Sequence, residues 1–149
     1  MFGFDPQHTH FNPYEKVLTP TNVSHLMPYW TASTGFGSRS SPAVANGVVY
    51  IGSYDYKLYA FTATTGKTLW TASTGSYIDS SSPAVANGVV YVGSADHKLY
   101  AFTTTTGKPL WTASTGAAID SSPAVANGVV YVGSADHKLY AFHLPGTTP

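Results

Sequence analysis

The sequence predicts an all-β fold, a β-propeller of four-stranded antiparallel blades, and two observations carry this prediction. A block reading SSPAVANGVVYVGSADHKLYAF at 81–102 recurs unchanged at 121–142, and with few changes at 40–61. The phrase WTASTG follows the same rhythm and begins at Trp30, Trp70 and Trp111. A period of 40 to 41 residues made of short β-type runs is typical of propeller blades.

Each strand and turn of the repeat has its own local signal. Asn87-Gly88 is the residue pair that most strongly favours a two-residue hairpin turn. The run 89–94 is β-branched and aromatic on both faces, as expected of a strand that is covered on both sides. The strands of this copy are expected at 83–86, 89–94, 99–102 and 110–114, with turns at 87–88, 95–98 and 106–108.

Proline supports the strand order within a blade. Pro28 and Pro109 both precede a tryptophan by two residues, in the expected fourth strand. Proline removes a hydrogen-bond donor from the ladder, so it belongs on an edge strand. The outermost strand of a blade is such an edge, which places the tryptophan strand on the outside.

The number of strands predicts how the chain is organised and how it assembles. We expect an N-terminal extended segment over 1–24 and three propeller blades over 25–149. The blades are expected around 41–73, 82–114 and 122–143, with an outer strand at 25–34 that completes a third blade in a velcro closure. Since propellers typically have 4–8 blades, the expected partner is a second copy. A six-bladed dimer is favoured over a nine-bladed trimer.

Composition narrows the functional classes. The 149 residues have a net charge of zero, and only 9% of them are charged. This balance argues against binding of nucleic acid or of anionic membrane. No cysteine is present, which excludes disulfides and thiolate chemistry and fits an extracytoplasmic or secreted protein. The first residues lack the pattern of a signal peptide, and no apolar run reaches the roughly 20 residues of a membrane span.

One blade motif resembles the quinoprotein-type (PQQ-like) β-propeller repeat, which is written Ala-x-Asp-x-x-Thr-Gly-Lys-x-x-Trp. The matching residues are Ala60, Thr65, Gly66, Lys67 and Trp70 in one copy, and Ala101, Thr106, Gly107, Lys108 and Trp111 in the next. Thr62 and Thr103 replace the family's Asp, and we expect their hydroxyls to take over part of its hydrogen bonding. The resemblance implies blade-to-blade docking through Trp30, Trp70 and Trp111.

The resemblance leaves several functions open. Family members include quinone-dependent dehydrogenases, which use a calcium site with Glu, Asn and Asp ligands and a cover such as a vicinal disulfide. With no cysteine and few acidic residues, this chain is expected to be a non-catalytic binding or scaffold module with no cofactor. The alternatives are a fragment of a PQQ-dependent dehydrogenase and a lectin-like carbohydrate-binding propeller. An unknown small molecule, glycan or protein is an expected ligand.

Candidate binding residues lie where the copies disagree, in the loops 35–39, 75–79 and 116–120. In a propeller these loops surround the mouth of the channel, so binding and intersubunit ion pairing are both expected there. The channel-mouth candidates are Arg39, Tyr77, Asp79 and Asp120. Three tyrosines that break the repeat are further recognition candidates: Tyr54, Tyr56 and Tyr77.

Two histidine motifs have structural interpretations as well as chemical ones. Asp96-His97 and Asp136-His137 would suit acid–base or metal chemistry. They fall in a hairpin turn where the family has Asp-Gly, so turn residues with positive φ are expected. His8-Thr9-His10 would place two imidazoles on one face of an extended chain, although a packed surface segment is favoured there.

Overall fold

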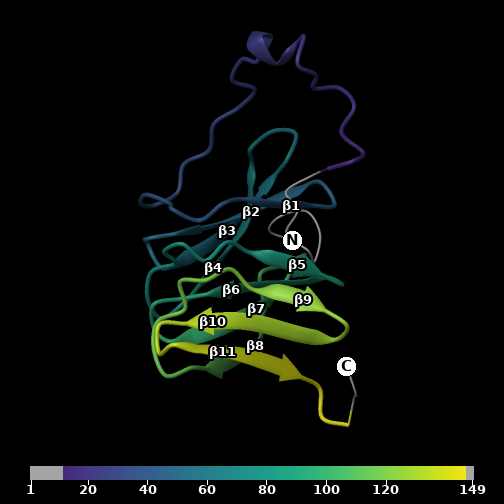
Figure 1. The fold of residues 1–149 in the computed structure, drawn as a ribbon. Coiled ribbons are helices and arrows are strands. Elements are labelled where there is room, and N and C mark those ends of the chain that lie inside the picture. Colours follow the sequence, from purple (N-terminus) through teal and green to yellow (C-terminus); the bar gives the residue numbers. More distant parts are fainter. Residues whose placement is uncertain (1–11, 147–149) are drawn as a thin grey trace.

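A computed structural model describes residues 12–146 as three antiparallel sheets and one 3₁₀ helix, η1 (Val23–His25). The first blade has the order β1-β2-β3-β4 and the second β5-β6-β7-β8, while the third sheet is β11-β10-β9. The sheets lie one behind another in chain order, with the segment before β1 at one end of the stack (Figure 1). The strands are β1 (Ala43–Ala45), β2 (Val48–Ser53), β3 (Lys57–Thr62), β4 (Thr68–Ser73), β5 (Ala84–Ala86), β6 (Val89–Gly93), β7 (Lys98–Thr103), β8 (Pro109–Ser114), β9 (Ala124–Ala126), β10 (Val129–Ser134) and β11 (Lys138–His143). The predicted all-β propeller blades, three in the chain, are confirmed.

The Asn-Gly pairs form the tight turns that their chemistry predicts. Asn87 has φ 49° and Gly88 φ 77°, and the other two copies repeat these values closely. Two successive positive φ angles are the mark of the type I′ turn, whose twist matches that of the flanking strands. The turn fixes the register of β5 on β6, with Ala84 opposite Tyr91.

The hydrophobic core lies between adjacent blades. Leu58 of the first blade and Val90 and Val92 of the second are fully buried in one cluster. Ile78, from the loop that joins these blades, is also fully buried there. A Cβ on Gly52 would come within 2.2 Å of the Ile78 side chain, so this strand glycine makes room for the loop. Burial therefore depends on having a neighbouring blade.

Trp30 and Trp70 each dock on the turn of the following blade, whereas Trp111, for which the resemblance implied the same docking, stays 42% exposed. The Trp70 indole N–H donates to the Thr104 carbonyl at 2.9 Å, and Trp30 makes the same bond to Ala63 at 2.9 Å. A Cβ on Gly107 would lie 2.4 Å from the Trp70 ring, at a position where φ is +68°. The glycine of the Thr-Gly-Lys turn thus supplies both the backbone conformation and the space for the incoming indole.

Thr103, which stands where the family motif has Asp, closes this turn through its hydroxyl. Thr103 Oγ1 accepts the backbone N–H of Lys108 at 3.1 Å, and it lies 2.7 Å from Thr106 Oγ1. The hydroxyl thus closes the turn that presents Gly107 to the tryptophan. No helix in the described part of the chain is long and apolar enough to cross a membrane.

The third blade is the one whose fourth strand was expected from a second copy, and that expectation stays a prediction. Its sheet has three strands, and β11 has no outer neighbour among residues 12–146. The outer strand expected at 25–34 to complete a third blade is not paired: residues 26–34 are not part of any sheet. Trp30 docks on the first blade, and the segment before β1 lies at the opposite end of the stack from β11 (Figure 1), so this segment does not reach β11 of its own chain.

Candidate functional site: the loop end of the blades

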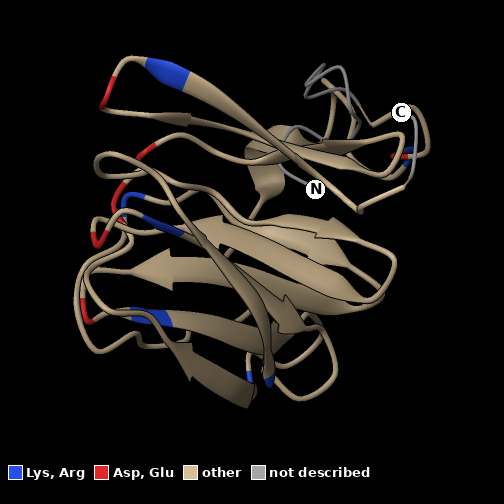
Figure 2. Ribbon diagram, turned by 90° about the horizontal axis from the view of Figure 1, so that it is seen from below, with Lys and Arg blue, Asp and Glu red and all other residues tan. Residues whose placement is uncertain are grey.

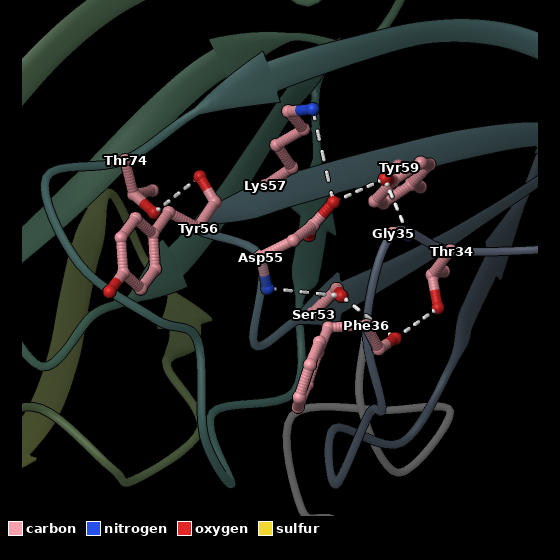
Figure 3. Close-up of polar contacts among 9 residues, drawn as sticks. All are labelled: Thr34, Gly35, Phe36, Ser53, Asp55, Tyr56, Lys57, Tyr59 and Thr74. Carbon is pink, nitrogen blue, oxygen red and sulfur yellow. Dashed lines mark hydrogen bonds and ion pairs between the residues drawn. The ribbon is translucent and has the colours of Figure 1, made fainter.

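The loops that enter the blades lie at one end of the molecule. The turns between the second and third strands of each blade (β2–β3, β6–β7 and β10–β11) lie at the same end. Most of the acidic residues gather at this end (Figure 2). In the first blade the Tyr59 hydroxyl donates to Asp55 at 2.5 Å and accepts the Gly35 N–H at 2.9 Å (Figure 3). The Ser53 hydroxyl donates to the Phe36 carbonyl at 3.2 Å. These bonds hold the entering loop against the turn of its own blade.

We call the hydrogen bonds that join the Tyr and Asp of a blade to the Gly of its entering loop the clamp. The aspartates of the two Asp-His pairs make these bonds in the second and third blades. His97 has φ 70° and His137 φ 68°, so the interpretation as turn residues with positive φ is confirmed. The Asp96 carboxylate accepts the Tyr100 hydroxyl and, at 3.1 Å, the Gly75 N–H. Burial, reinforced by the bond to Asp96, raises the pKa of Tyr100 to about 12. The carboxylate is therefore committed to holding a loop.

The third blade repeats the clamp. Asp136 accepts the Tyr140 hydroxyl at 2.5 Å and the Gly116 N–H at 3.1 Å. The Tyr140 hydrogen bond is the largest influence on Asp136, and it lowers the pKa of this carboxyl. The same three residue types thus fix the same loop in each blade, which leaves the other loop residues free to vary.

Five residues from the first loop, the β2–β3 turn and the second loop lie together, and we call them the rim cluster: Arg39, Tyr54, Tyr56, Tyr77 and Asp79. All of them break the repeat except Asp79, which recurs as Asp120. Arg39 Nη1 lies 3.6 Å from Asp79 Oδ1 and donates to the Tyr54 hydroxyl at 3.2 Å. Tyr54 in turn donates to Asp79. The hydrogen bond to Tyr54 is the main reason why the pKa of Arg39 is raised, and the bond to Asp79 raises the pKa of Tyr54.

Two exposed aromatic rings complete the rim cluster. Tyr77 lies with its ring centroid 5.4 Å from that of Tyr54 and 6.5 Å from that of Tyr56. Tyr56 is 50% exposed, Tyr77 39%, and the Arg39 side chain 70%. The cluster thus offers a cation and aromatic faces to solvent, a combination that suits planar or anionic ligands.

The structure brings together three of the four channel-mouth candidates. Arg39, Tyr77 and Asp79 share the rim cluster, whereas Asp120 is exposed on the next loop and does not take part. Sequence reasoning did not identify Tyr54 as the hydroxyl that bridges Arg39 and Asp79. The available signal was its break with the repeat, since Ala95 stands at the same position in the second copy.

The described residues do not gather a metal site. Among residues 12–146, no three His, Asp or Glu side chains lie close enough to hold an ion together. The His8-Thr9-His10 motif lies outside the described residues.

The fold and the blade-docking geometry define a β-propeller segment, and comparison with known families shows which kind. The family model described as glucose/ethanol/alcohol dehydrogenase, beta-propeller domain, matches residues 1–82. The model described as outer membrane protein assembly factor BamB matches residues 76–147. The chain belongs to the PQQ-type β-propeller family, as the sequence motif predicted.

Individual relatives agree with this assignment. The chain is 36% identical over 73 residues to the quinoprotein alcohol dehydrogenase PedH of Pseudomonas putida, and 34% identical over 74 residues to a quinoprotein ethanol dehydrogenase of Pseudomonas aeruginosa. These matches cover 46% and 47% of this chain but only 12% of each relative. The crystal structure of BamB from Moraxella catarrhalis shares the fold, with a TM-score of 0.68 and 24% identity over 76% of this chain and 36% of that chain.

The expectation that the chain is not an enzyme is wrong on these comparisons. Both sequence relatives are quinoprotein dehydrogenases, so the family to which the chain belongs includes enzymes. The expectation rested on the absence of cysteine and on the small number of carboxylates. This reasoning assumed that a complete cofactor site would lie within these 149 residues. The matched region spans about an eighth of each relative, so residues missing from this chain do not decide whether the whole protein holds a cofactor.

Proposed function

We propose that this chain forms part of the ring of a quinoprotein-dehydrogenase-type propeller, and that its rim cluster contacts the quinone. One observation carries the proposal: exposed tyrosine rings and an arginine lie together at the loop end of a chain whose first 82 residues match the dehydrogenase propeller model. The remainder of the ring comes from further blades.

The donor set of the rim cluster suits the organic part of pyrroloquinoline quinone. This molecule is a flat, conjugated ring system that carries carboxylates. The Tyr77 face offers a stacking surface, and the exposed Arg39 guanidinium offers a cation for a carboxylate. Asp79 keeps the guanidinium in place at 3.6 Å.

The described residues do not fit the metal of such a site. Because residues 12–146 bring no three acidic or histidine side chains together, we derive no step through a calcium ion. When bound, the quinone supplies a two-electron acceptor for alcohol oxidation. The role we assign to this chain is to bind and orient the ring system.

Titration of pyrroloquinoline quinone into the purified chain tests the proposal. Binding is followed by the absorbance of the quinone itself, so removing a tyrosine from the protein does not change the signal that is measured. We expect saturable binding that Tyr77→Ala weakens about two- to tenfold, since an aromatic contact contributes about 0.5–1.5 kcal/mol. Arg39→Gln is expected to weaken it more, because hydrogen bonds to charged groups contribute about 1.5–3 kcal/mol.

The chain provides its own matched control. Tyr77→Ala copies the residue that stands at the equivalent loop position, Ala118, so the loop is known to tolerate it. Tyr29 is 80% exposed outside the rim cluster, and Tyr29→Ala should leave the affinity unchanged. Absence of saturation, or equal affinities for Tyr77→Ala and the unmodified chain, would contradict the assignment.

A further inference from the structure

The two ends of the blade stack each leave an apolar surface bare. Leu139 on β11 is 75% exposed, whereas its counterparts Leu58 and Leu99 are fully buried against the following blade. On the first blade Val44 is 62% exposed, while its counterpart Val85 packs against the core between blades. At the junctions inside the chain, a surface like that of β11 is covered by a surface like that of the first blade. The two bare ends of the stack are therefore complementary to each other.

The segment 28–34 has the sequence and the position of an outer strand but no sheet. Its residues WTASTG at 30–35 are identical to those of β4 and β8. Trp30 docks on the Ala63 carbonyl as Trp70 of β4 docks on Thr104. Residues 28–34 are not part of any strand, and Tyr29 is 80% exposed. The segment is thus held where the fourth strand of a preceding blade would lie.

We infer that segment 28–34 of a second copy adds to β11 as its fourth strand, and that two such exchanges close two chains into one six-bladed ring. The edge that receives the segment reads KLYAFH at 138–143, against KLYAFT in both β3 and β7. Six blades fall within the usual range for a closed propeller. This inference goes beyond quinone binding and does not depend on it.

The paired strands inside the chain determine the register of the exchange. Opposite residues on β3 and β4 are Lys57 with Ser73, Leu58 with Ala72 and Ala60 with Trp70, and β7 and β8 repeat this pattern. Transferred to β11, the pattern places Ser33 of the second copy opposite Lys138, Ala32 opposite Leu139 and Trp30 opposite Ala141.

Hydrogen bonding follows from the same pattern. Thr74 N–H donates to the Tyr56 carbonyl at 2.8 Å, directly beside the Lys57–Ser73 pair. Because hydrogen-bonded and non-hydrogen-bonded pairs alternate in an antiparallel ladder, the Lys57–Ser73 pair is non-hydrogen-bonded and the Leu58–Ala72 pair is hydrogen-bonded. In the exchanged strand, the Ala32 N–H points toward β11 and the Ser33 N–H points away from it.

Cysteine pairing tests the register directly, because the chain has no native cysteine. Non-hydrogen-bonded pairs have Cα atoms about 4.5 Å apart, which a disulfide can span. The double variant Ser33→Cys with Lys138→Cys should oxidise to a covalent dimer on a non-reducing gel. The matched control, Thr31→Cys with Lys138→Cys, is two residues out of register and should stay largely unlinked. A cross-link at monomer mass, a ladder of higher masses or equal yields would overturn the inference.

Proline substitutions test the pairing of segment 28–34 with β11 without a cross-link. By light scattering, the unmodified chain should have twice the mass of one chain at micromolar concentration. Ala32→Pro removes the donor that faces β11 and should shift the mass to that of one chain. Ser33→Pro removes the outward donor and should retain the dimer. A monomeric unmodified chain, or two proline variants with the same mass, would contradict the exchange, whatever the quinone titration shows.

Discussion

The two junctions between blades have nearly the same sequence but differ in how well they are filled. At the first junction Trp70 docks on the Thr-Gly-Lys turn of the second blade and donates to Thr104 at 2.9 Å. At the second junction Trp111 remains 42% exposed. A groove of about 620 Å³ lies beside it, lined by residues that include Tyr91, Phe142 and Leu144.

The difference arises in the turn that receives the indole. The third copy reads HLPGTT at 143–148 where the second reads TTTTGK at 103–108, so Thr147 stands at the position of the glycine that admits the tryptophan. Trp111 instead packs edge-on against Phe142, with ring centroids 5.3 Å apart. Identical strands therefore do not give identical burial, because the neighbouring turn decides how much of the indole leaves water.

Truncation of the tryptophans provides the largest contrast. We expect Trp70→Ala to lower the free energy of unfolding by about 3 kcal/mol, because its partly buried ring packs on the core between blades and its N–H donates to Thr104. Trp111→Ala removes a ring that is already 42% exposed, so about 1–2 kcal/mol is expected from the smaller buried area. Urea unfolding at one fixed protein concentration measures both. Equal losses would show that the second junction is as tightly packed as the first.

A methyl group on the receiving glycine tests the turn itself. Gly107→Ala places a Cβ 2.4 Å from the Trp70 ring at φ +68°, and we expect a loss of about 2–4 kcal/mol from backbone strain and crowding together. Gly128→Ala provides the matched control, because its φ is +77° with nothing within 4 Å of the added Cβ. It should cost only the backbone strain, about 1–2 kcal/mol. If both variants lose the same amount, the close approach of the indole is not important for stability.

Local chemistry made the strands and hairpins of this chain predictable. Asn-Gly pairs demand two positive φ angles, and the structure has them at Asn87 and Gly88. Proline before tryptophan indicated the edge strand, and β8 does begin at Pro109 on the outer side of its sheet. Each of these features is decided within a few residues, which is why sequence alone was sufficient.

The rim cluster was only partly predictable, because it joins residues from different loops and turns. Arg39 and Asp79 were identified because they lie in the loops that differ most between copies, yet nothing in the sequence showed that Tyr54 bridges them through its hydroxyl. The contact of Ile78 with Gly52 was likewise hidden, since it depends on how one blade stacks on the next. Spatial neighbours 15 to 26 residues apart need the packed structure.

Alkaline titration provides the smallest and most local comparison. Tyr100 in the clamp of the second blade has a pKa of about 12 against an ordinary value of 10.0, so the folded protein holds this proton to higher pH than the unfolded chain does. Its contribution to stability is complete below pH 10 and is lost as the pH rises toward 12. Urea midpoints should therefore fall as the pH rises from 10 toward about 12, and Tyr100→Phe should flatten this fall. A slope unaltered by Tyr100→Phe would mean that the clamp does not hold its proton in the folded state.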